Sequence, residues 1–353
     1  MRPATFYAFA GLTAAAVVAA AVSVSMRPGT TTVNPGIEPA FPKLAGNVNA
    51  VAQIDVQDAK HKFSITRHGE KWGMDQKDGY PVEYDKVKSA IVATADFKLI
   101  EQKTSDPSRY KRLDLEAPDG PDAKSTKVVF KDDKGNVLAA AVIGKLKPSL
   151  FGSGGSGTYI RRDGEKATWL VRGEITLGKR PIDWMVKEIV NYGQEKVRKV
   201  VIKRPDGSSF SISKAKQSDS NFVVDDIPPG KKMKNPDEAN PLGGVTWRLL
   251  FDDVKLAKKQ NWPKQTYVAD YFTWSGLDIH IVTAKIGKDY WGRFHVSVAD
   301  DVTDPAKKKE AEKTAAKING LVDGWSYMLT AGDSEKLVSK KGDYLADAKK
   351  KGS

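Results

Sequence analysis

The pattern of apolar and polar positions along the chain begins with one long apolar run. Residues 5–26, TFYAFAGLTAAAVVAAAVSVSM, contain no charged side chain. As a helix, this run is long enough to cross the roughly 30 Å apolar core of a bilayer. Arg2-Pro3 precede it, and Arg27-Pro28 end it. The pattern therefore predicts a membrane anchor or an export signal in residues 1–27.

Two interpretations of this run stay open. The short basic start and the small residues Ala19, Ala21 and Ser23 suit a cleaved export signal. The run is longer than the ~7–15 apolar residues of a usual signal core, which favours a retained anchor. Both place the rest of the chain outside the cytoplasm, because a first helix normally leaves its basic end inside. We expect a single-pass inner-membrane protein whose C-terminal part lies in the periplasm.

Beyond the anchor, the chain repeats a pattern of strands. The strand-like KFSITR at Phe63 has a counterpart, SFSISK, at Phe210, which lies 147 residues later. Asp183-Trp184 similarly has a counterpart, Asp343-Tyr344, which lies 160 residues later. The two offsets predict a duplicated module whose second copy carries about a dozen extra residues. The charged stretch near 301–320 is where we expect them, as an exposed helix.

These patterns divide the chain into five segments: an anchor or signal (1–27), a Pro-, Gly- and Thr-rich linker (28–47), a first module (48–195), a second module with the insertion (196–348) and a basic tail (349–353).

Each module combines one helical stretch with strand-like runs. After Pro81, apolar residues recur at helical spacing (Val87, Ile91, Ala95, Leu99), and after Pro241 they do so again (Val245, Leu249, Leu250, Val254). Strand-like runs follow both helices, with hairpin turns at Asp132–Gly135 and Ser275-Gly276. This order of elements predicts an α+β fold, in which each of two tandem modules has an antiparallel sheet and a helix.

The stretch ITRHGEKWGM, residues 65–74, brings a histidine, a carboxylate and a tryptophan close together in sequence. Its alternation predicts a hairpin with His68 and Glu70 in the turn and Trp72 facing a core. The matching stretch of the second half has neither the histidine nor the tryptophan. We therefore interpret these residues as a structural hairpin and not as a reactive cluster.

Few residues of the chain could carry chemistry, since it has four histidines and no cysteine. His280 and His295 lie on strands that we expect to be adjacent, but two histidines without a third ligand make a poor metal site. No G-x-S-x-G motif is present. We therefore expect no catalytic residue, no metal and no cofactor; an envelope hydrolase is the enzymatic alternative.

Two surfaces are candidates for binding a partner or ligand. Aromatic residues and an arginine cluster on two strands that we expect to pair: Tyr271, Trp274, Tyr290, Trp291 and Arg293. Alternation should bury only some of these rings, so others should face outward. The second surface follows a glycine-rich loop within residues 147–162 and consists of Arg161 and Arg162.

The formal net charge of +13 suits anionic partners such as acidic glycans or lipid headgroups. Export makes nucleic acid an unsuitable partner. Most lysines are dispersed along the chain, which is typical of solvated faces.

Several segments together resemble a known family. They are EKWGM, Tyr80-Pro81 before a helix, SRYKRLDL, GNVLAAAVIG, GTYIRR, ATWLV and a short helix with Trp184. Over residues 48–190 they resemble the bacterial domain-of-unknown-function 4340 family. The resemblance implies one N-terminal membrane helix and a repeated extracytoplasmic α+β region. It also implies an association with ABC-2-type exporters and gliding-motility-associated ABC auxiliary proteins, and it carries over no catalytic residue.

We therefore expect a non-enzymatic, membrane-anchored periplasmic accessory protein of an ABC-2-type transport system. Its partners would be the permease or the gliding-motility-like auxiliary subunits. The alternative is an envelope module that binds anionic glycan or lipid headgroups.

Overall fold

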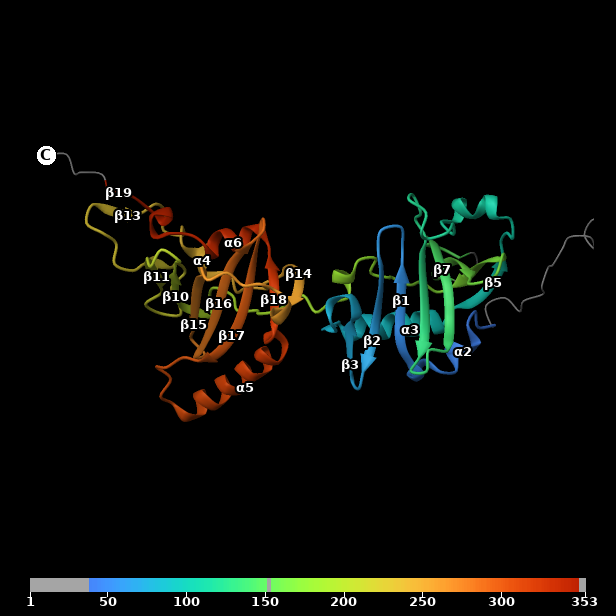
Figure 1. Cartoon of the computed structure of the whole chain (residues 1–353), viewed down its shortest axis with the longest axis horizontal. Coiled ribbons are helices and arrows are strands. Elements are labelled where there is room, and N and C mark those ends of the chain that lie inside the picture. The colour runs from blue at the N-terminus through green and yellow to red at the C-terminus, as the bar shows by residue number, and fades with distance from the viewer. Residues whose placement is uncertain (1–37, 151–153, 349–353) are drawn as a thin grey trace, which may run out of the picture. The chain divides into compact units, whose positions relative to one another are not determined.

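A computed structural model of the chain describes residues 38–150 and 154–348 and shows an α+β fold (Figure 1). The described residues form two compact units. The first comprises the residues up to Lys62 and Lys88–Lys179, and the second comprises Phe63–Val87 and the residues from Arg180 onward. The predicted anchor and basic tail lie outside the described residues. In the described part, no helix is long and apolar enough to cross a membrane.

The first sheet has nine strands in the order β4-β3-β2-β1-β6-β7-β8-β9-β5. Its strands are β1 (Val51–Gln57), β2 (Lys62–His68), β3 (Lys71–Met74), β4 (Tyr80–Pro81), β5 (Lys98–Gln102), β6 (Thr126–Asp132), β7 (Val137–Lys147), β8 (Gly157–Arg162) and β9 (Thr168–Arg172). The hairpin predicted at Asp132–Gly135 joins β6 to β7, and the Asp132 carboxylate accepts hydrogen bonds from the N–H groups of Lys134 and Asn136.

The helices of this half are short, apart from α3 (Tyr84–Ala95). The helix predicted after Pro81 is α3, although Leu99 lies beyond it on β5. The other elements are α2 (Pro42–Ala45) and the 3-10 helices η1 (Val48–Ala50), η2 (Asp75–Lys77), η3 (Pro107–Leu113) and η4 (Pro181–Asp183). Because α2 buries Leu44 completely, this part of the predicted linker is folded.

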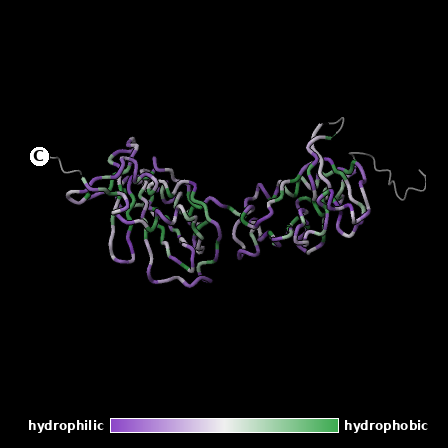
Figure 2. Tube along the Cα trace, turned by 90° about the horizontal axis from the view of Figure 1, so that it is seen from above, coloured by the Kyte–Doolittle hydropathy of each residue, from purple (hydrophilic) through white to green (hydrophobic). Residues whose placement is uncertain are grey.

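The second sheet has eight strands in the order β12-β11-β10-β15-β16-β17-β18-β14. Its strands are β10 (Val197–Lys203), β11 (Ser209–Ser213), β12 (Val223–Val224), β14 (Phe251–Leu256), β15 (Tyr267–Thr273), β16 (Leu277–Ile286), β17 (Asp289–Val298) and β18 (Trp325–Leu329). A separate pair joins β13 (Lys231–Met233) to β19 (Leu345–Asp347). Figure 2 shows hydrophobic and hydrophilic residues alternating along the traces, as expected for sheets with one buried face.

The helices of the second half are α4 (Asn240–Gly243), α5 (Pro305–Val322) and α6 (Ala331–Leu337), with the 3-10 helices η5 (Ala257–Lys259) and η6 (Lys341–Tyr344). The helix expected in the charged stretch is α5. Asp304 caps it by accepting a hydrogen bond from the N–H of Lys307, and Pro305 occupies its first turn. Its buried residues are Ala311, Ala315 and Val322, so most of its surface is solvent-exposed.

Eight strands of each sheet follow the same order. The order β3-β2-β1-β6-β7-β8-β9-β5 matches β12-β11-β10-β15-β16-β17-β18-β14, strand for strand. The β-bulges match as well. β1 and β10 each shift register after their first residue, and β5 and β14 carry equivalent shifts, at Leu99/Glu101 and Phe251/Asp253. The two sheets therefore share strand order and also local irregularities that bend specific strands.

The long helix predicted after Pro241 is wrong. Only α4 is helical, and Val254 lies on β14. Gly243 and Gly244 weaken a helix here, and Arg248 adopts a left-handed backbone conformation (φ 49°) that a helix does not allow. The pattern was misleading because Val245, Leu249 and Val254 are buried without forming one helical face, whereas Leu250 is exposed.

An aromatic cluster packs part of the second unit. Tyr80 makes edge-to-face contacts with Trp325, Phe251 and Tyr327, with ring centroids 5.0, 5.6 and 6.1 Å apart. Its hydroxyl donates a hydrogen bond to the Val186 carbonyl at 2.9 Å. Burial raises the pKa of Tyr80 above its ordinary value. These contacts attach the residues around Tyr80 to strands β14 and β18, which belong to the same unit.

The hairpin predicted at residues 65–74 is confirmed by the pairing of β2 with β3. Trp72 is buried, with the Arg67 guanidinium 6.0 Å from its ring centroid, whereas His68 and Glu70 are exposed. Trp72→Ala should therefore lower the free energy of unfolding by about 3–5 kcal/mol, because it leaves a large cavity. His68→Ala, in the same hairpin, should change it by less than about 0.5 kcal/mol. Urea denaturation followed by circular dichroism tests both, and equal effects would contradict the assignment.

Candidate functional site

The predicted aromatic surface is partly buried. Tyr271 is 0% exposed and Trp291 is 4% exposed, so neither ring faces outward. The two strands that carry these rings do not pair, because β16 lies between β15 and β17. Tyr271 is buried because alternation along β15 places it on the core face with Ala269 and Thr273. Tyr271 instead donates a hydrogen bond to the Leu242 carbonyl at 3.0 Å, which attaches α4 to the sheet.

The other three residues of that surface are partly exposed but have neighbours of their own. Arg293 lies over the Trp262 ring at 4.0 Å and donates hydrogen bonds to Ser326 Oγ and the Ala257 carbonyl. The Lys285 ammonium lies 5.9 Å from the ring centroid of Tyr290. Trp274 lines a separate hollow of about 290 Å³ beside Arg198 and Asp301, which form an ion pair. The structure therefore does not gather these residues into one aromatic platform.

Arg161 and Arg162 lie on β8 in the first half. Arg161 lies 4.9 Å from the Tyr110 ring centroid and donates a hydrogen bond to the Leu115 carbonyl. Arg162 lies 5.6 Å from the ring centroid of Trp169 and pairs with Glu165 at 3.0 Å. Both guanidinium groups therefore have intramolecular partners.

Polar side chains gather on β15 and β16 around His280. His280 on β16 lies opposite His295 on β17, which confirms that the two strands are adjacent. His280 Nδ1 lies 2.6 Å from Asp270 Oδ1, and Lys203 donates to the other oxygen of Asp270 at 3.0 Å. The hydrogen bond to Asp270 raises the pKa of His280. Burial alone would raise the pKa of Asp270, but the bonds from His280 and Lys203 hold it below its ordinary value.

Asp278 adds a second carboxylate to this cluster. Its Oδ1 is buried and accepts no hydrogen bond from the described residues. Burial, with repulsion from Asp270 as a smaller cause, raises the pKa of Asp278 to about 6. Among the described residues, no group of three His, Cys, Asp or Glu side chains is arranged to hold a metal ion. The cluster is therefore a hydrogen-bonded polar network on the sheet.

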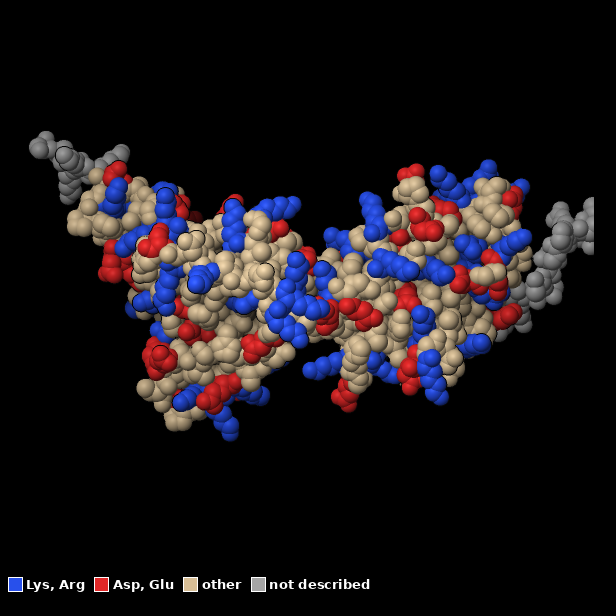
Figure 3. All heavy atoms as spheres, in the orientation of Figure 1, with Lys and Arg blue, Asp and Glu red and all other residues tan. Residues whose placement is uncertain are grey.

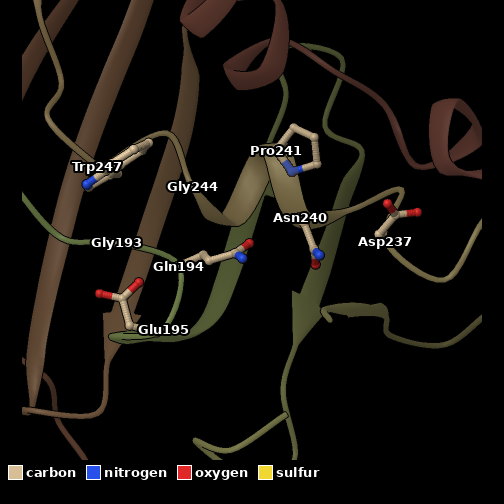
Figure 4. A pocket seen from close by; sticks show the side chains of 8 residues that line it. All are labelled: Gly193, Gln194, Glu195, Asp237, Asn240, Pro241, Gly244 and Trp247. Carbon is tan, nitrogen blue, oxygen red and sulfur yellow. The ribbon is translucent and has the colours of Figure 1, made fainter. Parts of the chain in front are cut away.

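A cavity of about 480 Å³ opens elsewhere in the second unit, between two irregular segments. Gly193, Gln194 and Glu195 form one wall, and the residues from Asp237 to Trp247 form the other (Figure 4). Hydrogen bonds join the walls at their base. The Tyr192 N–H donates to the Thr246 carbonyl at 2.7 Å, and Thr246 Oγ1 donates to the Tyr192 carbonyl at 2.8 Å. An antiparallel bridge between Val190 and Leu249 continues this pairing.

Two further contacts hold the α4 wall in place. Asn240 Oδ1 accepts a hydrogen bond from the Phe222 N–H at 2.9 Å, and Asn240 Nδ2 donates to Asn221 Oδ1 at 2.7 Å. Gly243 lies so close to Phe222 that a Cβ at this position would approach the ring to 2.2 Å. Only glycine therefore fits at position 243 without displacing the ring.

Trp247 is the most exposed large apolar side chain of the described residues, at 63%. Its indole lines the cavity together with the amides of Gln194 and Asn240 and the carboxylates of Glu195 and Asp237. The volume lies within the roughly 300–1,000 Å³ range of small-ligand pockets, and Gln194 and the two carboxylates supply polar anchoring groups. The sequence reasoning missed these residues, because the helix predicted after Pro241 would have placed Trp247 on an ordinary helical surface.

The buried carboxylate gives a prediction for Asp278→Asn. A folded-state pKa near 6, above the usual value of 3.8, means that stability is complete at low pH and is lost as the pH rises through about 6. Asp278→Asn should therefore raise the free energy of unfolding by about 1–2 kcal/mol at pH 7.5, after allowance for partial solvent screening. It should have little effect at pH 4. Thermal melts from pH 4 to pH 8 test this, with exposed Asp122→Asn as the control. A gain that does not depend on pH would contradict the proposed cause.

The chain was also compared with known proteins. The sequence profile of a domain of unknown function, DUF4340, matches residues 72–271, which is more than half of the chain. No curated protein and no solved structure matched. The matched range runs from the buried Trp72 to Tyr271, and it includes both walls of the cavity. On this match, the chain belongs to the DUF4340 family.

Proposed function

We propose that the protein is a non-enzymatic, membrane-anchored periplasmic accessory protein that acts through protein–protein contacts in an ABC-2-type transport system. The apolar run of residues 5–26 supports the anchor, and the transport association is what the resemblance of the sequence segments implies. The expected partner is the permease or a gliding-motility-like auxiliary subunit.

We also infer that the soluble part arose by duplication. The shared order of eight strands and the matching bulges support this inference. So do the two capping boxes that close the repeats: Arg180 with Asp183, and Lys340 with Asp343. These pairs are 160 residues apart, in agreement with the alignment of Asp183-Trp184 with Asp343-Tyr344.

The observation that carries the proposal of partner binding is the exposure of Trp247 and Leu250, at 63% and 45%. Tryptophan is among the residues that dominate binding energy at protein interfaces, especially beside a pocket. Water contact with large apolar side chains is unfavourable, and a partner that covers them gains roughly 25 cal/mol per Å² of apolar surface buried. A cavity with such a rim is therefore a suitable docking site for a protein segment.

Site-specific photo-crosslinking tests this proposal. A benzophenone amino acid at position 250, beside Trp247, should crosslink in native membranes to a permease or auxiliary subunit of an ABC-2-type transporter, identified by mass spectrometry. The same probe at position 309, on the exposed surface of α5, should not. Adding Trp247→Ala to the position-250 probe should lower the yield by at least about fivefold. Recovery of the protein alone from both positions would overturn the proposal.

The alternative, binding of an anionic glycan or lipid headgroups, depends on the charge of +13. On the face seen in Figure 3, Lys and Arg are interspersed with Asp and Glu and do not form one continuous basic patch. Many basic side chains have acidic partners, for example Arg198 with Asp301 and Lys131 with Asp55. Retention on an acidic glycan that disappears as salt rises, without any crosslink at position 250, would favour this alternative.

A further inference from the structure

We infer that the Trp247 cavity binds a lysine or arginine side chain of a partner protein, held between the Trp247 indole and the Glu195 carboxylate. This inference rests on the proposed function, and it names the chemistry of the partner at that site.

The charge of the lining is the first argument. The ionisable side chains that line the cavity are Glu195 and Asp237, and none of the lining residues is a lysine or arginine. This acidic lining contrasts with the basic chain as a whole. At physiological ionic strength, charges beyond roughly 8 Å are largely screened, so the distant lysines of the chain contribute little to the potential inside the cavity. An anionic ligand would be repelled there, and a cationic one would be attracted.

Basic side chains near the cavity have partners of their own, and one of them, Lys214, bonds to the backbone of a lining residue. The Lys214 ammonium donates to the Gln194 carbonyl at 3.2 Å and lies 4.7 Å from the ring centroid of Phe222. Burial lowers the pKa of Lys214, although Glu195 and Asp219 oppose that shift. Lys196 lies 5.9 Å from the ring centroid of Tyr192. Arg248 is exposed and does not line the cavity. Among the described residues, no side chain that lines the cavity is therefore a cation.

The placement of the anionic and aromatic groups is the second argument. In the view of Figure 4, Glu195 lies on the same side of the cavity as Trp247, and Asp237 lies at the other end. The Glu195 carboxylate folds over Gly193, where a Cβ would meet its oxygens at 2.3 and 2.5 Å. Gly193 therefore leaves the space that the carboxylate occupies. A cation beside an indole face and near a carboxylate gains from both the ring quadrupole and the charge.

The two hydrogen bonds between Tyr192 and Thr246 hold together the backbone segments that carry Glu195 and Trp247. They fix the start of the Gly193–Glu195 segment against the residue that precedes Trp247. A partner would therefore not have to order both walls when it binds, which lowers the entropic cost of association. Arginine and tryptophan also pair frequently at interfaces, because the planar guanidinium stacks on aromatic rings.

The test uses the full-length protein in detergent and three short synthetic peptides that differ only at the central residue: arginine, citrulline or glutamate. Citrulline has the shape of arginine without its charge. Isothermal titration should show that the arginine peptide binds at least tenfold more tightly than the citrulline peptide, and that the glutamate peptide does not bind. Equal affinity for arginine and citrulline would overturn the inference, and so would preference for an uncharged disaccharide.

Variants of the cavity sharpen the test. Trp247→Ala and Glu195→Gln should each weaken binding of the arginine peptide by about tenfold. Glu238→Gln, which removes a carboxylate next to Asp237 but outside the lining, should not. Gly193→Ala should weaken binding by displacing the Glu195 carboxylate. Melting temperatures of all variants show whether they are folded. Unchanged affinity in a folded Trp247→Ala variant would overturn the inference.

The two proposals can fail separately. Arginine-dependent peptide binding without a crosslink from position 250 to a transporter subunit would support the cation site and overturn the proposed function. A crosslink from position 250 to a transporter subunit, without preference for the arginine peptide, would support the proposed function and overturn the cation site.

Discussion

The candidate site depends on one constraint: the segment from Asp237 to Leu250, which is helical only at α4, must satisfy its other backbone polar groups outside the sheet. It does so partly through turn hydrogen bonds of its own, such as the one from the Trp247 N–H to the Gly244 carbonyl, and partly by bonding to residues 189–192. Tyr192 and Thr246 exchange two hydrogen bonds, and Leu249 pairs with Val190. Tyr271 and Asn240 add side-chain bonds that attach α4. Without these bonds, neither cavity wall would have a fixed position.

The same constraint explains why the core and the cavity share residues. Tyr271 is fully buried, and its hydroxyl has a partner only because α4 presents the Leu242 carbonyl to it. Phe222 packs against Gly243, and its backbone N–H bonds to Asn240. A buried hydroxyl without a partner would cost free energy. The helix α4 therefore forms part of the cavity wall and also supplies the hydrogen-bond acceptor for Tyr271, a buried residue of the sheet.

The sequence was sufficient to predict the elements whose burial follows a regular period. Alternation predicted the β2–β3 hairpin, and the helical spacing of Val87, Ile91 and Ala95 predicted α3. It failed in the segment after Pro241. The buried residues Val245, Leu249 and Val254 imitate helical spacing there, although only α4 is helical and Val254 lies on β14. The site was missed because its geometry depends on long-range hydrogen bonds, such as those between Tyr192 and Thr246. Such bonds do not appear as a periodic pattern in the local sequence.

If the two sheets descend from one module, the candidate site lies where the two copies differ in structure. The bulges at Leu99 and Phe251 are equivalent, so Trp247 occupies the position of Ala95, the last residue of α3. In the first copy, this region is a twelve-residue helix that buries Ala95, at 5% exposure. In the second copy, glycines and the left-handed Arg248 interrupt the helix, and the indole is exposed beside a cavity. Replacing a packed helix with an open segment exposes apolar surface, which is unfavourable unless something covers it. Partner binding, as proposed above, would cover this surface and would give the divergence a physical reason.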